Sequence, residues 1–188
     1  MKILISGAPR SGKSTFMKIL IKELKNEYNI IGFLTPEVKE GRSRIGFDLI
    51  SIDSNNRFPL ARKGNYKSKF CLGKYHVFID KFNNFLEKKI EREIVKYNNQ
   101  NKKEVILIDE IGKMELFSNK FELFLRNLFN SELLIVATIG KTLKHPIKSF
   151  LMNNTEIKYF ELTRQNQAEV LNKILAILKN IEKEKNSK

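Results

Sequence analysis

Eight residues near the start of the chain have the types and spacing of a phosphate-binding loop. They are Gly7-Ala8-Pro9-Arg10-Ser11-Gly12-Lys13-Ser14, which match the pattern G-x-x-x-x-G-K-[ST]. Such a loop turns its backbone N–H groups inward around a phosphate chain, and its two glycines leave room for that approach. An apolar run, residues 2–5, precedes the pattern, and a helical pattern, residues 15–25, follows it. This context is that of a P-loop, so we expect it to bind nucleotide phosphates.

Three side chains of this segment have separate predicted roles. Lys13 reaches the β- and γ-phosphates as a point charge. Ser14 places its hydroxyl on a Mg²⁺ ion that bridges those phosphates, and Thr15 packs behind it or contacts phosphate. The phosphates also lie at the positive end of the helix that begins near Lys13. The sequence therefore predicts a nucleotide site over residues 7–15, with Mg²⁺ as its cofactor.

A second group of chemically capable residues follows another apolar run. The run Val105-Ile106-Leu107-Ile108 places Asp109 and Glu110 at the carboxyl end of a buried strand, where ligands bind in open α/β sheets. This is the pattern of a Walker B motif. We expect Asp109 to hold Mg²⁺ opposite Ser14. We expect Glu110 to orient or deprotonate the water that attacks the γ-phosphate, with Glu115 as the alternative.

Composition and charge limit the class of protein. The chain has 188 residues and a single cysteine, Cys71, and its apolar runs are too short to span a membrane. We therefore expect one compact, monomeric domain in the cytoplasm, with no membrane partner. The formal net charge of +14 attracts polyanions, which include nucleotides and nucleic acids. The charge is spread along the chain without an aromatic and basic platform, so the sequence does not favour nucleic acid.

The remaining pattern predicts alternating strands and helices around the two motifs. Residues 30–35 form a strand, and residues 36–80 form a β-rich insertion with long loops. The basic residues of the insertion either cover the bound phosphates or form an ordinary surface. Helices are expected at 81–97, at 121–129 and after Thr163, and strands at 105–108, 133–137 and 157–162. Together these elements form a single α/β domain over residues 1–180, and residues 181–188 form a frayed basic tail.

Three segments together resemble one known family. They are residues 7–15, residues 41–48 (GRSRIGFD) and residues 108–118 (IDEIGKMELFS), and they are similar to the THEP1 nucleoside-triphosphatase family. The resemblance implies a small cytoplasmic Mg²⁺-dependent enzyme that hydrolyses ATP, GTP, CTP and UTP with little base selectivity, and nucleoside diphosphates more weakly. It also implies a P-loop NTPase three-layer sandwich with a mainly parallel central sheet. In the RecA-like strand order of that fold, one strand lies between the P-loop strand and the Asp109 strand.

One position departs from the family pattern, because Arg10 stands where the family loop often has glycine. Two other functions use the same motifs: a small-molecule or nucleoside kinase, and a nucleotide-gated nucleic-acid-binding protein. We expect the transition state to use a further cation, and Arg164 can instead stack on the nucleotide base. The candidates for this cation are Arg42, Arg44, Arg62, Lys113 and Arg164.

Overall fold

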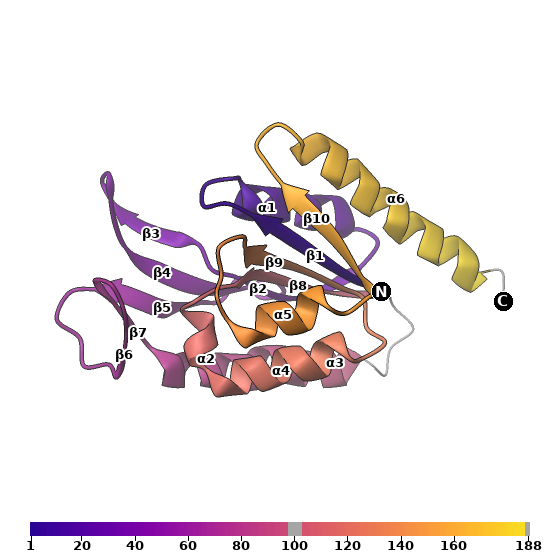
Figure 1. Ribbon diagram of the computed structural model, residues 1–188. Helices are drawn as coiled ribbons and strands as arrows, with labels where there is room; N and C mark the ends of the chain where they lie inside the picture. The colour runs from indigo at the N-terminus through magenta and orange to yellow at the C-terminus, as the bar shows by residue number, and fades with distance from the viewer. Residues whose placement is uncertain (98–102, 187–188) are drawn as a thin grey trace.

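The computed structural model describes residues 1–97 and 103–186, and in these residues ten strands form one sheet. Their order is β10-β1-β9-β8-β2-β4-β5-β7-β6, and β3 pairs with β4 (Figure 1). One half is parallel: β1 (Lys2–Gly7), β2 (Asn29–Leu34), β8 (Glu104–Ile111), β9 (Ile135–Gly140) and β10 (Ile157–Leu162). The other half is antiparallel: β3 (Glu37–Glu40), β4 (Ser43–Ser51), β5 (Arg57–Lys63), β6 (Phe70–Leu72) and β7 (Tyr75–Val77).

The parallel half places the two motifs at one edge of the sheet. Strand β9 pairs with β1 on one side and with β8 on the other, so it lies between the P-loop strand and the Asp109 strand. This confirms the RecA-like order that the family resemblance implies. Every residue of β1 is buried, as expected for an aliphatic strand covered on both faces. The carboxyl ends of β1 and β8 therefore open on the same side, separated by one strand.

The antiparallel half is a direct continuation of this sheet. Strand β4 pairs with the end of β2, where Phe33 lies opposite Ser51. The strands between residues 36 and 80 thus extend the sheet on the side of β2, and Figure 1 shows them projecting beyond the helices. Strand β2 joins the two halves, and it contacts β8 closely at Gly32 (φ +142°). A Cβ atom at Gly32 would lie 1.8 Å from the carbonyl oxygen of Leu107.

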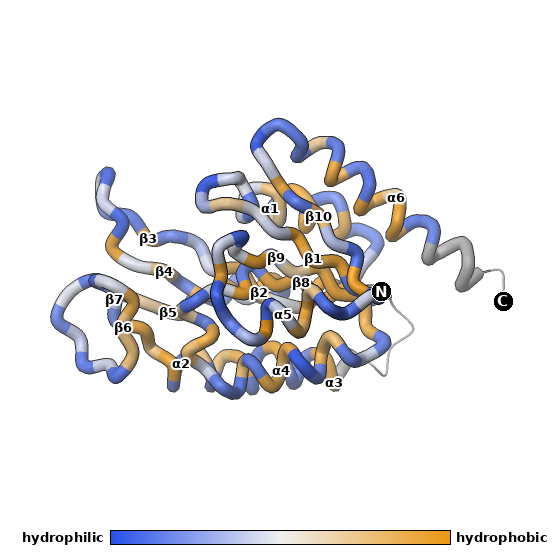
Figure 2. Tube along the Cα trace, viewed as in Figure 1, coloured by the Kyte–Doolittle hydropathy of each residue, from blue (hydrophilic) through white to orange (hydrophobic). Residues whose placement is uncertain are grey.

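Helices cover both faces of the parallel half. One face packs against α1 (Lys13–Leu24) and α6 (Gln167–Asn186), with Phe16, Leu20 and Ile174 fully or almost fully buried. The other face carries a helical layer made of α2 (Ile79–Phe85), α3 (Arg92–Tyr97), α4 (Asn119–Phe129), α5 (Pro146–Met152) and the 3₁₀ turn Glu115–Phe117. Figure 2 shows hydrophobic residues concentrated on the central strands and hydrophilic ones at the hairpin tips. The result is a three-layer sandwich.

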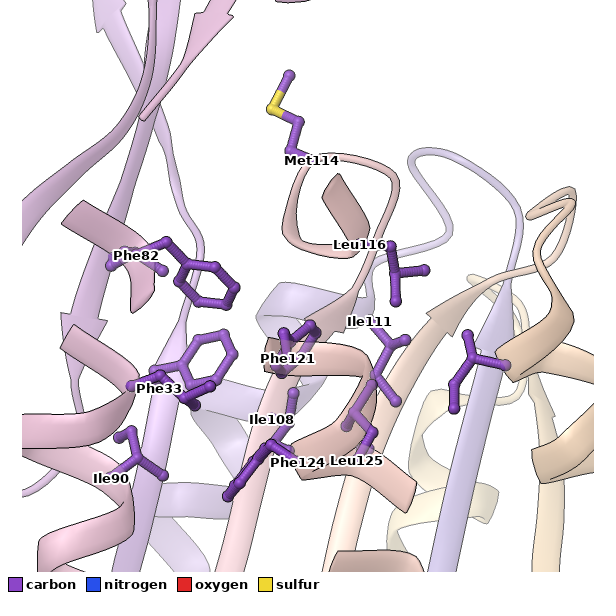
Figure 3. Close-up of a cluster of buried hydrophobic side chains, with 14 of the residues drawn as sticks. Phe33, Phe82, Ile90, Ile108, Ile111, Met114, Leu116, Phe121, Phe124 and Leu125 are labelled. Atoms are coloured by element: carbon purple, nitrogen blue, oxygen red, sulfur yellow. The ribbon is translucent and has the colours of Figure 1, made fainter. Parts of the chain in front are cut away.

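An aromatic cluster anchors the second helical layer below the Walker B strand. Phe33 of β2, Phe82 of α2 and Phe121 of α4 are fully buried, and their ring centroids lie 5.1–5.9 Å apart. Figure 3 shows these rings beside Ile108, the residue before Asp109. Edge and tilted ring contacts at this spacing add to the area buried. The cluster therefore supports the strand ends that carry the acidic residues.

Three elements differ from the sequence expectation. The helix expected at 81–97 consists of α2, a π-helical segment (Leu86–Glu91) and α3, and the wider turns leave both Leu86 and Ile90 buried. The helix expected after Thr163 begins only at Gln167, and the Thr163 hydroxyl accepts a hydrogen bond from the Asn166 N–H in the turn between them.

Helix α6 also extends farther than the frayed tail expected at 181–188 allows. It continues to Asn186, because Glu and Lys are good helix formers, and residues 187–188 lie outside the described residues. Over residues 1–97 and 103–186, none of the helices has the length and apolar character needed to cross a membrane.

Candidate active site

The phosphate loop lies between the end of β1 and the start of α1. The Ser11 N–H donates to the Ala8 carbonyl (3.1 Å), which closes the turn. A Cβ atom at Gly7 would lie 2.3 Å from the Ser11 hydroxyl oxygen and 3.0 Å from the Leu162 carbonyl oxygen, so a side chain here would have to displace Ser11. Gly12 (φ +95°) and Arg10 (φ +66°) have left-handed backbone conformations. The family glycine at the position of Arg10 therefore has a physical reason, since an L side chain is strained in this region.

Lys13 is folded back across the mouth of the loop. Its buried ammonium donates to the carbonyl oxygens of Gly7 (3.1 Å) and Ala8 (3.4 Å). The same group forms an ion pair with Glu110, with Nζ and Oε2 3.5 Å apart. Lys13 thus joins the P-loop to the Walker B motif, two segments almost one hundred residues apart. Ala8, Pro9, Ser14 and Thr15 lie exposed around it, where a ligand can reach them.

Asp109 is buried at the end of the parallel strands, with 2% of its surface exposed. The Thr138 hydroxyl on β9 donates to its Oδ1 (2.6 Å), which fixes the orientation of the carboxylate. Burial raises the pKa of Asp109, whereas hydrogen bonds from Thr138 and Ser14 and the charge of Lys13 lower it. Ser14 and Asp109, the two predicted Mg²⁺ ligands, are therefore neighbours. Thr138 is itself fully buried, so its contact with this carboxylate is closed to solvent.

Thr35 is a site residue that sequence reasoning missed. It directly follows β2, whose last residue, Leu34, lies opposite Asp109 in the parallel register. Its hydroxyl donates to the Asp109 carbonyl (2.9 Å) and accepts from the Glu110 N–H (3.2 Å). Thr35 thereby holds both polar groups of the peptide unit between Asp109 and Glu110, the unit from which the Glu110 side chain departs. The available signal was a threonine immediately after a buried strand that neighbours the Walker B strand.

Glu110 and Glu115 lie together over Gly112 in different electrostatic environments. A Cβ atom at Gly112 would lie 2.6 Å from one oxygen of Glu115 and 3.1 Å from one of Glu110. Burial, followed by the charges of Glu110 and Asp109, raises the pKa of Glu115 to about 8. Burial and Asp109 also raise the pKa of Glu110, but Lys13 lowers it. Near neutral pH, Glu115 is therefore a protonated acid, whereas Glu110 is paired with a cation.

The start of α6 supports the phosphate loop from the other side. Arg164 donates from Nε to the carbonyl of Arg10 (3.1 Å). Gln167 donates from Nε2 to the carbonyl of Ser11 (3.1 Å), and this atom would lie 2.3 Å from a Cβ at Gly12. Arg164 thus lies at the nucleotide loop, and it contacts the loop backbone. Sequence reasoning missed Gln167, because only the folded chain brings α6 to residues 10–12.

Comparison with known proteins agrees with this geometry. A family model described as NTPase matches residues 2–175. The chain is 38% identical to the nucleoside-triphosphatase THEP1 of Thermotoga maritima, over 95% of this chain and 96% of the relative. It is 34% identical to that of Methanocaldococcus jannaschii, over 95% of this chain and all of the relative. The chain belongs to the THEP1 nucleoside-triphosphatase family.

Solved structures of similar proteins have the same fold. The crystal structure of THEP1 from the hyperthermophile Aquifex aeolicus superposes with a TM-score of 0.82 at 34% identity, over 95% of this chain and 99% of that chain. The solution structure of a human cancer-related nucleoside triphosphatase gives 0.75 at 28% identity, over 95% and 97%. The THEP1 resemblance and the P-loop NTPase fold expected from the sequence are both confirmed.

The five candidate cations of this THEP1 family member lie in different surroundings, with Arg164 at the phosphate loop as described above. Arg62 forms an ion pair with the buried Asp48 and donates to the Phe47 carbonyl (2.8 Å), so its contacts lie within the β4–β5 ladder. Lys113 is exposed after the Walker B motif. Arg42 and Arg44, in contrast, line a cavity that Arg10 also lines.

Proposed function

We propose that the protein hydrolyses the γ-phosphate of nucleoside triphosphates, with little selectivity among ATP, GTP, CTP and UTP and weaker action on diphosphates. The observation that carries this proposal is the contact between the two motifs. Lys13 of the P-loop lies 3.5 Å from Glu110, and Asp109 beside it is hydrogen-bonded to Thr138. A phosphate-binding cation and a candidate water-positioning carboxylate thus meet at one strand edge. The names of the relatives support the same reaction class.

Lys13 changes partners when a nucleotide binds. In the structure its ammonium is satisfied by two loop carbonyls and by Glu110. The oxygens of the β- and γ-phosphates offer stronger, charge-assisted hydrogen bonds to the same group. Transfer of Lys13 to the phosphates frees the Glu110 carboxylate, which then faces the γ-phosphate and its attacking water. Substrate binding thereby prepares the group that positions the water.

Glu110 suits the water-positioning role better than Glu115. A group that orients or accepts a proton must have a carboxylate available at the working pH. Glu115 retains its proton near neutral pH, because its pKa is about 8, and only 4% of its surface is exposed. The Glu110 side chain is 37% exposed. We assign Glu115 a supporting role, in which it packs beside Glu110 over Gly112.

The chemistry of the donor set fits Mg²⁺. The Ser14 hydroxyl and the Asp109 carboxylate are hard oxygen ligands, which this ion prefers over nitrogen or sulfur. When bound, the ion neutralises charge that develops on the phosphate oxygens. Thr138 keeps one oxygen of Asp109 in a fixed direction, and Thr35 holds the adjoining peptide. We therefore assign Ser14 and Asp109 as the metal ligands.

The position of Arg164 is consistent with little selectivity among the four bases. Its guanidinium lies at the outer side of the phosphate loop, exposed and bonded to the Arg10 carbonyl. A planar cation can stack on the face of a base, and every nucleotide base presents such a face. Stacking of this kind does not distinguish the four bases, whereas hydrogen bonds to base edges would.

Phosphate release without an added acceptor tests the proposal. ATP, GTP, CTP and UTP are compared, each with Mg²⁺, in the wild type, Lys13→Ala, Glu110→Gln and Glu115→Gln. Because each removed group acts on the transition state, Lys13→Ala and Glu110→Gln should lose about 100-fold or more in kcat/KM. The exposed Lys158→Ala on β10 serves as the matched control for the loss of one lysine. No release in the wild type would refute hydrolysis, and full activity of Glu110→Gln with loss in Glu115→Gln would reverse the two roles.

A further inference from the structure

A strongly basic cavity lies next to the phosphate loop, and apart from Arg10 of that loop its residues have no part in the hydrolysis described above. Its volume of about 520 Å³ lies within the range of small-molecule sites. The cations that line it are Arg10, Lys39, Arg42, Arg44, Lys63 and Lys74. Glu37 is the one acidic residue in its lining among the described residues. Several like charges gathered around one cavity repel each other, and a bound anion relieves this repulsion.

Four separate segments form the cavity. Arg10 comes from the phosphate loop, Arg42 and its neighbours from the β3–β4 hairpin, Lys63 from the end of β5, and Lys74 from the β6–β7 turn. The cavity therefore connects the antiparallel half of the sheet to the nucleotide loop. This arrangement favours a phosphate-covering role for the basic residues between 36 and 80, because several of them line one cavity together with Arg10 of the phosphate loop.

One of these cations is held rigidly in place. Arg44 donates from Nη1 to Glu37 (2.5 Å) and from Nε to the Tyr75 hydroxyl (3.0 Å). Its guanidinium also lies over the Phe47 ring, 4.9 Å from the centroid. Lys39 is the second cation near Glu37, at 3.5 Å. The acid of the cavity is thus already engaged by two cations, and the other cations face the cavity with an excess of positive charge.

The cavity lies on the side of the phosphate loop where the chain continues from Thr35 into β3. Glu37 lies two residues beyond Thr35, which bonds both polar groups of the peptide between Asp109 and Glu110. In the proposed function Glu110 marks the γ-phosphate end of the substrate. A phosphate chain that continues past the γ-phosphate therefore runs from the loop, along Arg10, toward Arg42 and Lys74.

We propose that this cavity binds a condensed phosphate group beyond the γ-phosphate, so that ligands with four phosphates bind more tightly than those with three. This inference rests on the proposed function, which sets the direction of the chain. The phosphate group comes either from the nucleotide itself, as in a nucleoside tetraphosphate, or from a separate inorganic chain. Both sources present the same closely spaced negative charges to the cations of the cavity.

The first test compares the affinities of adenosine 5′-tetraphosphate and ATP. Titration calorimetry with Mg²⁺ uses the Glu110→Gln protein, so that hydrolysis does not interfere. We expect the tetraphosphate to bind about three- to tenfold more tightly, because partly exposed ion pairs are individually weak. The double change Arg42→Ala/Lys74→Ala should remove this preference. Both residues are exposed, so the fold should tolerate the change.

A matched control separates the cavity from the general charge of the protein. Lys22→Ala/Lys158→Ala also removes two exposed cations, at positions on α1 and β10. It should keep the tetraphosphate preference. The proposal is overturned if the Glu110→Gln protein with Arg42 and Lys74 intact binds the tetraphosphate no more tightly than ATP. It is also overturned if both double variants change this preference equally.

The second test is independent of hydrolysis and of the nucleotide. In Lys13→Ala the phosphate loop loses its main cation, and we measure the binding of inorganic tripolyphosphate. Binding that persists in Lys13→Ala and weakens at least threefold when Arg42→Ala/Lys74→Ala is added supports the cavity, with an inorganic chain as a source. Equal binding with and without the added changes refutes it. Support here without phosphate release from nucleotides would refute the hydrolysis proposal alone.

Discussion

Replacing Glu115 by glutamine should remove a steep pH dependence from the stability of the nucleotide-free protein. Glu115 lies in the 3₁₀ turn after Gly112, with 4% of its surface exposed. Burial, with the charges of Glu110 and Asp109, raises its pKa from 4.5 to about 8. The folded protein therefore keeps this proton over a range of pH in which the unfolded chain releases it. Glutamine has nearly the same shape and no proton to release.

The sign of the effect follows from the proton difference between the two states. Between pH 4.5 and about 8 the folded state binds more protons than the unfolded state, so the free energy of unfolding falls as pH rises. Each pH unit contributes about 1.4 kcal/mol, which amounts to about 5 kcal/mol over the whole interval. Below pH 4.5 the contribution of Glu115 is complete, and above pH 8 it is lost. This change is comparable to the total stability of many domains.

Urea denaturation at unit intervals from pH 5 to pH 9 measures the effect. The difference in unfolding free energy between Glu115→Gln and the wild type should grow in favour of the variant by about 1.4 kcal/mol per unit up to pH 8. Glu23→Gln, an exposed position on α1, controls for the loss of one carboxylate. Parallel pH curves for wild type and Glu115→Gln would refute the argument, because they would show that Glu115 has the same proton affinity in both states.

Three further variants test other contacts. Thr35→Val removes both hydrogen bonds to the peptide between Asp109 and Glu110, so phosphate-release assays should show kcat lower by about 10- to 100-fold, and unfolding should become about 1–2 kcal/mol easier. Arg10→Gly relieves a left-handed conformation, and urea denaturation should show about 0.5–1 kcal/mol of added stability; a loss would contradict the strain argument. Arg62→Ala removes the nearer of the two ion pairs of the buried Asp48 carboxylate and leaves the longer one to Arg57, so unfolding should become about 2–3 kcal/mol easier. An unchanged kcat in the folded protein would assign Arg62 to the fold alone.

The sequence was most informative where chemistry is recorded in local spacing. Gly7, Gly12 and Lys13 form a loop whose geometry is fixed by a few adjacent residues, so the pattern alone indicated it. The apolar run before Asp109 and Glu110 likewise located the end of a buried strand. The meeting of these segments at one edge followed from the rule that ligands bind at the carboxyl ends of parallel strands.

Contacts between distant strands could not be obtained in this way. Thr35 contributes to the site only because Leu34 lies opposite Asp109, and that register depends on the folded sheet. Gln167 reaches the Ser11 carbonyl only because α6 packs beside α1. The position of β9 between β1 and β8 came from the family resemblance, since periodicity describes single strands and carries no information about their neighbours.

Gly32 sets a limit on how this protein can vary. It lies on the strand shared by the nucleotide-binding and antiparallel halves, where even a methyl group would meet the β8 backbone at 1.8 Å. Gly41 and Gly73, at the hairpin turns of the basic cavity, have open space around the same atom and need only a left-handed backbone (φ +56°). A saturation library should therefore recover asparagine at both turns and only glycine at position 32. The hairpins around the cavity are free to diversify, while the seam that carries them is not.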